Sequence, residues 1–364
     1  MRAAETLLGQ NLPGKKIKGN WHVFDKIERR STDTGGRFSV GYKVRHDDGR
    51  EAFMKASDCS LLGEEGDDMF GKFAAGILSY KSEIEILDYC RGNNMDRVVV
   101  SIDYGQTLII YDGIQQPLVW IIFELASSDA RRQLTVSSAF DFTWALHAMH
   151  NLSVGVKQLH TASVAHNDIK PSNVLIFDPK LQKLGDLGSA TSTHFATTND
   201  HKSCAGDPIY AAPENLYSHL DNAPAMSFER RRASELYLLG SMACFLVSQP
   251  MVTPYLLSKL DPIHRPICNG SGWQGDFEGV LPYWNEAFSE MLIEIEASLP
   301  KKDGQLTDAA KEYLTAISQL CNPNPAKRGH PTNLIGQRDR YSVERYISIF
   351  DRLRKRAMVK SIAA

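Results

Sequence analysis

The stretch from His166 to Glu214 decides the fold of this chain, because it contains three polar motifs in order. It reads HNDIKPSN at 166–173, GDLGSA at 185–190 and AGDPIYAAPE at 205–214. One such match alone would carry little information, but three matches in register argue strongly against chance.

The three motifs resemble the catalytic loop, the metal-binding motif and the end of the activation segment of eukaryotic-like serine/threonine protein kinases, a family with bacterial members. The resemblance covers about residues 20–335, with Leu187 in place of the phenylalanine of the metal-binding motif. It implies an α+β, bilobal kinase-like fold. A small antiparallel β-sheet lobe with one main helix would precede a larger, mainly helical lobe.

The expected domains follow from the same resemblance. They are an N-terminal extension (1–20), an N-lobe (21–125), a C-lobe (126–335) with the hinge at about 124–129 and a loop-rich insertion at about 250–285, and a C-terminal helix or tail (336–364).

By resemblance, Asp168 and Lys170 are the catalytic pair. Phosphoryl transfer needs aligned reactants and neutralised charge more than covalent help from the protein. Asp168 would orient the acceptor hydroxyl and accept its proton, and Lys170 would balance the charge on the transferred phosphoryl group. The lysine at this place favours serine and threonine acceptors over tyrosine, again by resemblance.

The resemblance makes Asn173 and Asp186 the metal ligands, since Mg²⁺, or Mn²⁺ in its place, prefers hard oxygen ligands. The run VLIFDPKLQKLGD between them has two apolar stretches around a DPK turn. This pattern predicts a β-hairpin that brings both ligands to one site.

Lys55, in the predicted strand EAFMKAS, would pair with the α- and β-phosphates of ATP and with a glutamate of the next predicted helix, 73–90. Glu83 matches the family's pattern, and apolar residues at helical spacing flank it. Glu85 is the alternative, but it would face elsewhere, about 200° around the helix.

A loop between the predicted strands 21–28 and 38–45 would cover the phosphates with backbone N–H groups, which need glycine for close approach. Gly35 and Gly36 are present, but Ser39 stands where the family's last glycine would be. This signal is weak when taken alone.

Two positions above the expected adenine site depart from the family. Gly41 stands in place of a valine, and Phe53 in place of an alanine. One position has lost volume and the other has gained it. We therefore expect a compensating exchange, because packed sites tolerate a conserved total volume best.

The run PLVWIIFELA at 117–126 resembles the strand that enters the hinge. Phe123 would lie at the back of the nucleotide pocket, and Glu124 and Ala126 would offer backbone groups to adenine. Asp129 could bind the ribose hydroxyls or cap a helix, and the sequence leaves both readings open.

Two departures bear on regulation and catalysis. Asn167 replaces an arginine that engages a phosphorylated activation loop in many kinases, so a phosphate on Ser203 would lack its main partner. We therefore expect activity without obligatory phosphorylation of this loop. Asp207 replaces a threonine, and its carboxylate could either repel Asp168 or bind Lys170.

Composition sets the remaining bounds. The 364 residues carry a net charge of −2, which gives no general attraction to nucleic acid or to an anionic membrane. Six scattered cysteines indicate reduced thiols, and the N-terminus lacks the apolar core of a signal peptide. We expect a cytoplasmic protein without a membrane anchor, a buried helix at 233–247, and a basic helix from 338 docked on the lobe.

The sequence thus predicts an ATP- and Mg²⁺-dependent serine/threonine protein kinase whose protein substrates include itself. Four residues at 55, 168, 173 and 186 would gather on one metal–triphosphate. A pseudokinase scaffold and a small-molecule kinase of the same fold are the alternatives. The physiological substrate and the oligomeric state are left open.

Overall fold

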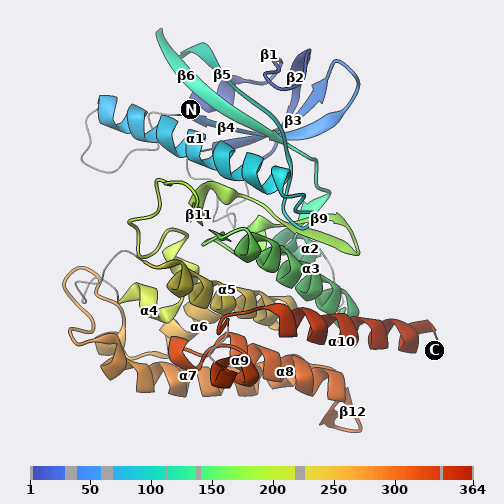
Figure 1. Ribbon diagram of the computed structural model, residues 1–364, viewed down its shortest axis with the longest axis vertical. Helices are drawn as coiled ribbons and strands as arrows, with labels where there is room; N and C mark the ends of the chain where they lie inside the picture. The colour runs from blue at the N-terminus through green and yellow to red at the C-terminus, as the bar shows by residue number, and fades with distance from the viewer. Residues whose placement is uncertain are drawn as a thin grey trace. The chain divides into compact units, whose positions relative to one another are not determined.

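The computed structural model describes residues 3–28, 39–58, 69–111, 113–136, 141–217, 226–336 and 339–362 (Figure 1). The chain forms two compact units. The first contains residues 1–128 and 185–188, and the second contains residues 129–184 and 189–364.

The first unit is built on a six-stranded antiparallel sheet with the strand order β1-β2-β3-β4-β6-β5. The strands are β1 (Asn11–Pro13), β2 (Asn20–Lys26), β3 (Ser39–His46), β4 (Glu51–Asp58), β5 (Ser101–Tyr111) and β6 (Ile114–Phe123). The helix α1 (Met69–Gly92) is joined to β5 by the Tyr80 hydroxyl, which donates to the carbonyl of Gly105 at 2.9 Å.

Burial alternates along β3 and β4, as expected for strands with one face on a core. Trp21, Tyr42, Met54 and Trp120 are fully or almost fully buried on that face. Lys55 follows Met54 directly and therefore projects from the opposite face of β4.

The N-terminal residues contribute to this sheet and core, which the sequence did not predict. A short 3-10 helix, Ala3–Thr6, and β1 precede β2, and Ala3, Ala4, Leu7 and Leu12 belong to the core. The buried carboxylate of Asp103 accepts hydrogen bonds from the N–H groups of residues 15 and 16 and from the indole of Trp21. Residues 3–20 are therefore an integral part of the first unit.

The second unit is mainly helical. Its helices are α2 (Ala130–Val136), α3 (Phe142–Thr161), α4 (Pro213–Leu216), α5 (Phe228–Ser248), α6 (Val252–Lys259), α7 (Phe277–Ser298), α8 (Asp308–Leu320), α9 (Pro331–Gly336) and α10 (Glu344–Ile362), with the 3-10 turns Pro171–Asn173, Pro208–Tyr210, Pro262–His264 and Pro325–Lys327. The short strands are β8 (Val164–Ala165), β9 (Val174–Asp178), β10 (Leu181–Leu184), β11 (Thr191–Ser192), β12 (Lys301–Lys302) and β13 (Gln305–Leu306). The pieces β7 (Ser128–Asp129) and Leu187–Ser189 lie where the chain passes from one unit to the other.

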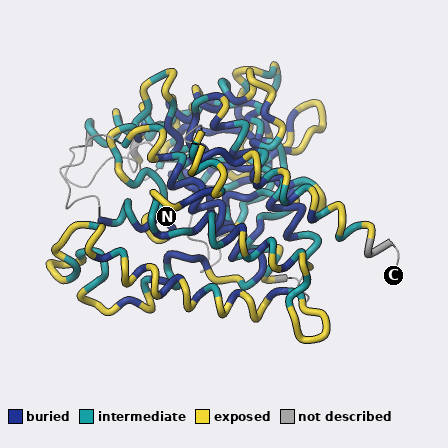
Figure 2. The backbone as a smooth tube through the Cα atoms, turned by 60° about the horizontal axis from the view of Figure 1, so that its bottom comes forward, coloured by how far each residue is buried: buried dark blue, intermediate teal, exposed yellow. Residues whose placement is uncertain are grey.

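Three elements of the second unit follow the predictions. The strands β9 and β10 form the predicted antiparallel hairpin. The helix α5 is buried along almost its whole length, and Figure 2 colours such buried residues dark blue. The helix α10 docks on α3, with Lys157 Nζ 2.7 Å from Glu344 Oε1, and buries Tyr346 and Phe350.

The predicted loop-rich character of residues 250–285 is only partly right. The helix α6 occupies Val252–Lys259, and α7 begins at Phe277 with the Asp276 side chain as its N-cap. Pro282 does not interrupt α7 and lies inside its N-terminal half.

Within the described part of the chain, no single helix has the length and apolar composition to cross a membrane. The pair α5 and α6 reaches that composition only together, across a bend of 85°.

Candidate active site

Lys55 lies at the centre of an ion-pair network in the first unit. Its Nζ atom lies 2.9 Å from Glu83 Oε1 on α1 and 2.8 Å from Asp186 Oδ1. Glu83 is buried, whereas Glu85 is exposed on another side of α1. The structure therefore pairs the lysine with Glu83 and not with Glu85.

The electrostatics of this network keep the lysine charged. Burial lowers the pKa of Lys55, but the carboxylates of Asp186 and Glu83 together raise this pKa well above its ordinary value. Burial is the largest cause that raises the pKa of Glu83; Asp186 adds to it and Lys55 opposes it. Lys55 is thus cationic at every physiological pH, as a phosphate-binding group must be.

Asp186 adopts a backbone conformation that few residues tolerate. Its φ angle is +59°, in the left-handed region, where aspartate is found more often than most side chains. Its side chain is 39% exposed although one oxygen faces Lys55. The carboxylate is therefore accessible to solvent as well as being fixed by the ion pair.

A second network joins Asp168, Lys170, Asn173 and Asp207 in the second unit. Lys170 Nζ lies 2.9 Å from Asp168 Oδ2 and 3.5 Å from Asp207 Oδ2. Asn173 Nδ2 donates to the carbonyl and to Oδ2 of Asp168, at 2.8 and 3.0 Å. The backbone N–H of Asp207 donates to Asp168 Oδ1 at 3.1 Å.

This geometry resolves the alternatives that the sequence left open for Asp207. Its carboxylate shares the ammonium of Lys170 with Asp168, and it also caps the 3-10 turn Pro208–Tyr210 by accepting from the N–H of Ile209. The ammonium of Lys170 lies within ion-pair distance of both carboxylates and so offsets the repulsion between them.

The loop that carries Asp168 is anchored to two helices through Glu235. The N–H of Asn167, whose φ is +63°, donates to Glu235 Oε1 of α5 at 2.8 Å, and the other oxygen of Glu235 bonds to His160 of α3. Burial raises the pKa of Glu235, but the hydrogen bond and charge of His160, with His166 and the Asn167 N–H, hold this pKa below its ordinary value overall. The ionised carboxylate fixes the start of the loop.

The predicted adenine contacts are placed as follows. The strand β6 ends at Phe123, which is buried, and residues 124–127 are irregular and partly exposed. The N–H of Glu124 donates to the carbonyl of Val100, and Glu124 Oε1 accepts from the Val100 N–H at 2.8 Å. Ala126 is half-buried, and nothing in its contacts tests a role in binding adenine.

Asp129 has the geometry of a helix cap. Its Oδ1 atom accepts from the N–H of Arg132 at 2.9 Å, at the start of α2, and its Oδ2 atom lies 3.2 Å from Arg132 Nε. Burial raises the pKa of Asp129, against the N–H bonds and charges of Arg132 and Arg131. Binding of ribose by Asp129 stays a prediction.

Gly41 and Phe53 are in contact, as the volume exchange requires. A Cβ atom built on Gly41 would lie 2.9 Å from Cε2 and 3.3 Å from Cζ of Phe53, which is tighter than ordinary packing. Ser39 is the first residue of β3. The predicted phosphate-loop residues Gly35 and Gly36 lie outside the described residues.

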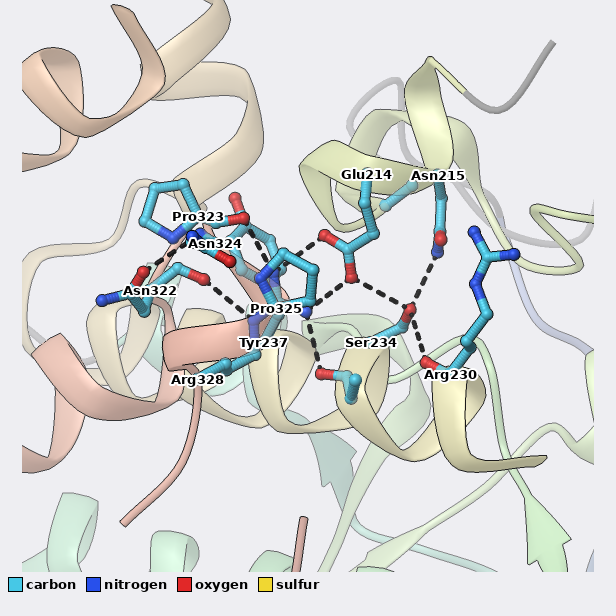
Figure 3. A network of polar contacts seen from close by, with 12 residues as sticks. Glu214, Asn215, Arg230, Ser234, Tyr237, Asn322, Pro323, Asn324, Pro325 and Arg328 are labelled. Carbon is cyan, nitrogen blue, oxygen red and sulfur yellow. Dashed lines mark hydrogen bonds and ion pairs between the residues drawn. The ribbon is translucent and has the colours of Figure 1, made fainter. Parts of the chain in front are cut away.

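Glu214 forms a buried ion pair with Arg328, which lies 114 residues later in the chain. Arg328 is fully buried and makes two contacts with the carboxylate, at 2.6 and 2.8 Å (Figure 3). It also donates to three backbone carbonyls, those of residues 233, 322 and 323, and its guanidinium lies 5.1 Å from the centre of the Tyr237 ring. The end of the AGDPIYAAPE motif is thereby fixed to the core of the second unit.

One further residue next to this site was missed by the sequence reasoning. Arg231 of α5 is buried and donates to the backbone of residues 199–202. The available signal was its spacing: Arg231 precedes Glu235 by four residues, so both side chains lie on one face of α5.

One protein family and several curated proteins are similar to this chain in sequence. The family model described as "Protein kinase domain" matches residues 35–256. Among curated proteins, "Nik-related protein kinase" of Mus musculus is 24% identical over 262 residues, covering 67% of this chain and 17% of that protein. "Probable serine/threonine-protein kinase pknA2" of Bifidobacterium longum is 22% identical over 242 residues, covering 65% of this chain and 27% of that protein.

A third relative is "Calcium/calmodulin-dependent protein kinase kinase" of Caenorhabditis elegans. It is 27% identical over 165 residues, covering 43% of this chain and 29% of that protein. In each of these three relatives, the matched region is less than a third of the relative's own length.

Proposed function

Since this chain belongs to the protein kinase domain family, we propose that it transfers the γ-phosphoryl group of ATP to serine or threonine hydroxyls of proteins, including its own. The proposal includes the bilobal arrangement of that family and a cytoplasmic location.

The observation that carries the proposal is the network of Asp168, Lys170 and Asn173. The carboxylate of Asp168 is held at one oxygen by Asn173 and Lys170 and at the other by the N–H of Asp207. A carboxylate fixed in this way can orient a hydroxyl and accept its proton without reorganising first.

Each unit also offers a side-chain oxygen that would suit a divalent cation. The side-chain oxygen of Asn173 is aimed by the two hydrogen bonds that its amide donates to Asp168, and Asp186 offers a partly exposed carboxylate. These are hard oxygen donors of the kind that Mg²⁺ prefers. When bound, the metal would neutralise charge on the phosphates.

The chain's own groups have separate tasks in this proposal. Lys55 binds phosphate oxygens and is oriented by Glu83. Asp168 positions the acceptor hydroxyl and takes its proton, and Lys170 stabilises the charge on the phosphoryl oxygens. In the absence of substrate, Asp207 would keep the ammonium of Lys170 next to Asp168, and the ammonium would then bind the phosphoryl oxygens when substrate is present.

The direct experiment is incubation of the full chain with labelled ATP, Mg²⁺ and a degenerate serine/threonine peptide library. We expect phosphate on peptide and on the protein itself with the wild type, and a loss of at least about 100-fold with Asp168→Asn, which keeps the shape and removes the base. Asp178→Asn is a matched control, because Asp178 is an exposed residue of the β9–β10 hairpin. ATP binding without transfer under any condition would reject the proposal.

A pseudokinase scaffold that binds partner proteins without turnover is the second candidate, and the large side chain of Phe53 is the observation that favours it. If the ring fills the space that adenine needs, ATP binding by the wild type will be undetectable by calorimetry and Phe53→Ala will restore it. If the ring packs into the volume that Gly41 vacates, the wild type binds ATP and Phe53→Ala weakens binding.

A further inference from the structure

Arg231 is a buried cation whose guanidinium donates hydrogen bonds to backbone carbonyls of a loop and forms no ion pair with a carboxylate among the described residues. It is 3% exposed, and its Nη2 atom donates to the carbonyls of Asn199, Asp200 and Lys202, at 3.1, 2.9 and 3.2 Å. Its Nη1 atom donates to Asn167 Oδ1 at 3.4 Å. Within the described parts of the chain, no carboxylate lies within ion-pair distance of this guanidinium.

The loop is shaped to present these carbonyls. Asp200 accepts from the N–H and from the hydroxyl of Thr197, both at 2.7 Å, and the N–H of Lys202 donates to the carbonyl of Asn199 at 3.1 Å. A buried charge costs free energy unless hydrogen bonds replace its hydration. The guanidinium and the turn at 197–202 therefore depend on each other.

The same stretch of chain ends on Asp168. Gly206 packs so closely on the preceding loop that a Cβ atom there would lie 2.2 Å from the carbonyl oxygen of Asn167. The next N–H, that of Asp207, donates to Asp168 Oδ1. Only three residues separate Lys202 from Gly206, so displacement of the turn would move the Asp207 N–H away from the carboxylate.

A phosphate is not needed to hold this arrangement. Ser203 is exposed and lines a pocket with Arg231 and Asn167, but the pocket has a volume of about 20 Å³. The pocket itself has room for about one water molecule, so a phosphate on the exposed Ser203 would project into solvent instead of entering it. The cation that a phosphate on Ser203 would require is already bound to three carbonyls.

We propose that Arg231 is a positioning residue that holds residues 199–207 in the conformation that orients Asp168, without phosphorylation of the segment. Its effect on turnover rests on the proposed kinase function, whereas its effect on the loop does not. Arg231 makes no contact with the reacting atoms in this proposal and acts through Asp207 and Asn167.

The first test is hydrogen exchange of backbone amides in the full chain without nucleotide. Arg231→Met should speed exchange of the Lys202 and Asp207 amides by about tenfold or more, since both lose the fixed turn. Arg230→Met is the matched control, because Arg230 is exposed on the same turn of α5, and it should exchange like the wild type. Unchanged exchange in Arg231→Met would overturn the proposal.

The second test measures transfer to the degenerate peptide library. Arg231→Met should lower kcat/KM for peptide by about tenfold or more and leave the Kd for ATP within about twofold. Arg231→Lys should recover part of the loss, because an ammonium can still donate to the carbonyls, and Ser203→Ala should match the wild type. Loss of turnover in Ser203→Ala, or unchanged peptide kinetics in Arg231→Met, would contradict positioning by Arg231.

The two tests separate the possible failures. A wild type that transfers no phosphate would reject the proposed function while the exchange result still decides the role of Arg231 in the loop. Should Arg231→Met fail to fold, Arg231→Lys carries the same exchange comparison, with intermediate protection expected.

Discussion

At the scale of single residues, Gly41 and Phe53 show how two unusual side chains can be explained only together. Glycine in the middle of a strand weakens it, because no side chain packs there. Here the ring of Phe53, on β4, extends toward Gly41 on the neighbouring strand β3 and occupies the space next to it. The pair is therefore one packing unit, and its parts should not be exchangeable separately.

Gly41→Val should weaken ATP binding by about tenfold, because its side chain would force the Phe53 ring away from its place and into the expected adenine site. The double variant Gly41→Val/Phe53→Ala should regain most of the affinity. Calorimetry with ATP and Mg²⁺ measures both. Equal affinities of Gly41→Val and the wild type would show that the two residues do not line the nucleotide site.

The ion pair of Lys55 makes a second prediction at this scale. Glu83→Gln should lower kcat/KM for ATP by about 10- to 100-fold, because the lysine would turn fully to Asp186 and lose its orientation. Glu85→Gln, two residues away, is the control and should change kcat/KM for ATP by less than about twofold. Similar losses in both variants would indicate a general effect on α1 and not the pairing.

At the scale of secondary-structure elements, prediction from the sequence succeeded where periodicity was strong. The buried helix predicted at 233–247 corresponds to α5, and the turn signal before residue 186 correctly predicted the β9–β10 hairpin. The strand β1 was missed because three residues, one of them proline, carry no periodic pattern. The helices α6 and α7 were partly missed because the stretch 250–285 was predicted to be rich in loops, whereas Pro254 and Pro282 both lie inside helices.

The residues of the candidate site also fall into those that a local sequence pattern located and those that it could not. The motifs located Asp168, Lys170 and Asn173, since their spacing within one loop is local. The partner of Asp207 and the role of Arg231 depend on contacts between residues far apart in the chain, and no local pattern contains them. The assignment of Asn173 and Asp186 to one metal remains a prediction.

The connection between α4 and the chain after α8 depends on one buried ion pair. Arg328→Met should lower the free energy of unfolding by about 3–5 kcal/mol, because Glu214 would be left buried without its cation. Lys327→Met, at an exposed neighbouring position, should change it by less than about 0.5 kcal/mol. Urea unfolding at neutral pH measures the difference, and equal midpoints would refute a structural role for the pair.

At the scale of the whole molecule, Glu235 should make the free energy of unfolding depend on pH in the acidic range. Its pKa is lowered in the folded chain, so the folded state takes up this proton less readily than the unfolded state. The stabilisation is complete above the ordinary glutamate pKa of 4.5 and is lost as the pH falls through the folded value.

Glu235→Gln should therefore be less stable than the wild type at pH 7, and the gap should narrow as the pH falls below about 4.5. Urea unfolding at a series of pH values tests this, with Glu229→Gln, an exposed residue in the first turn of α5, as control. A gap of constant size across the series would assign the loss to packing and not to the charge.

The recognisable family span, 35–256, is shorter than the two compact units, which also include β1, β2 and the helices from α7 onward. A gene fragment cut to that span would lack β1 and β2, leaving β3 as a bare edge open to intermolecular pairing. It would also lose Arg328, so the carboxylate of Glu214 would have no cation to neutralise it. Expression trials with such a fragment should give aggregates, and failure there would say nothing about whether the intact protein is an enzyme.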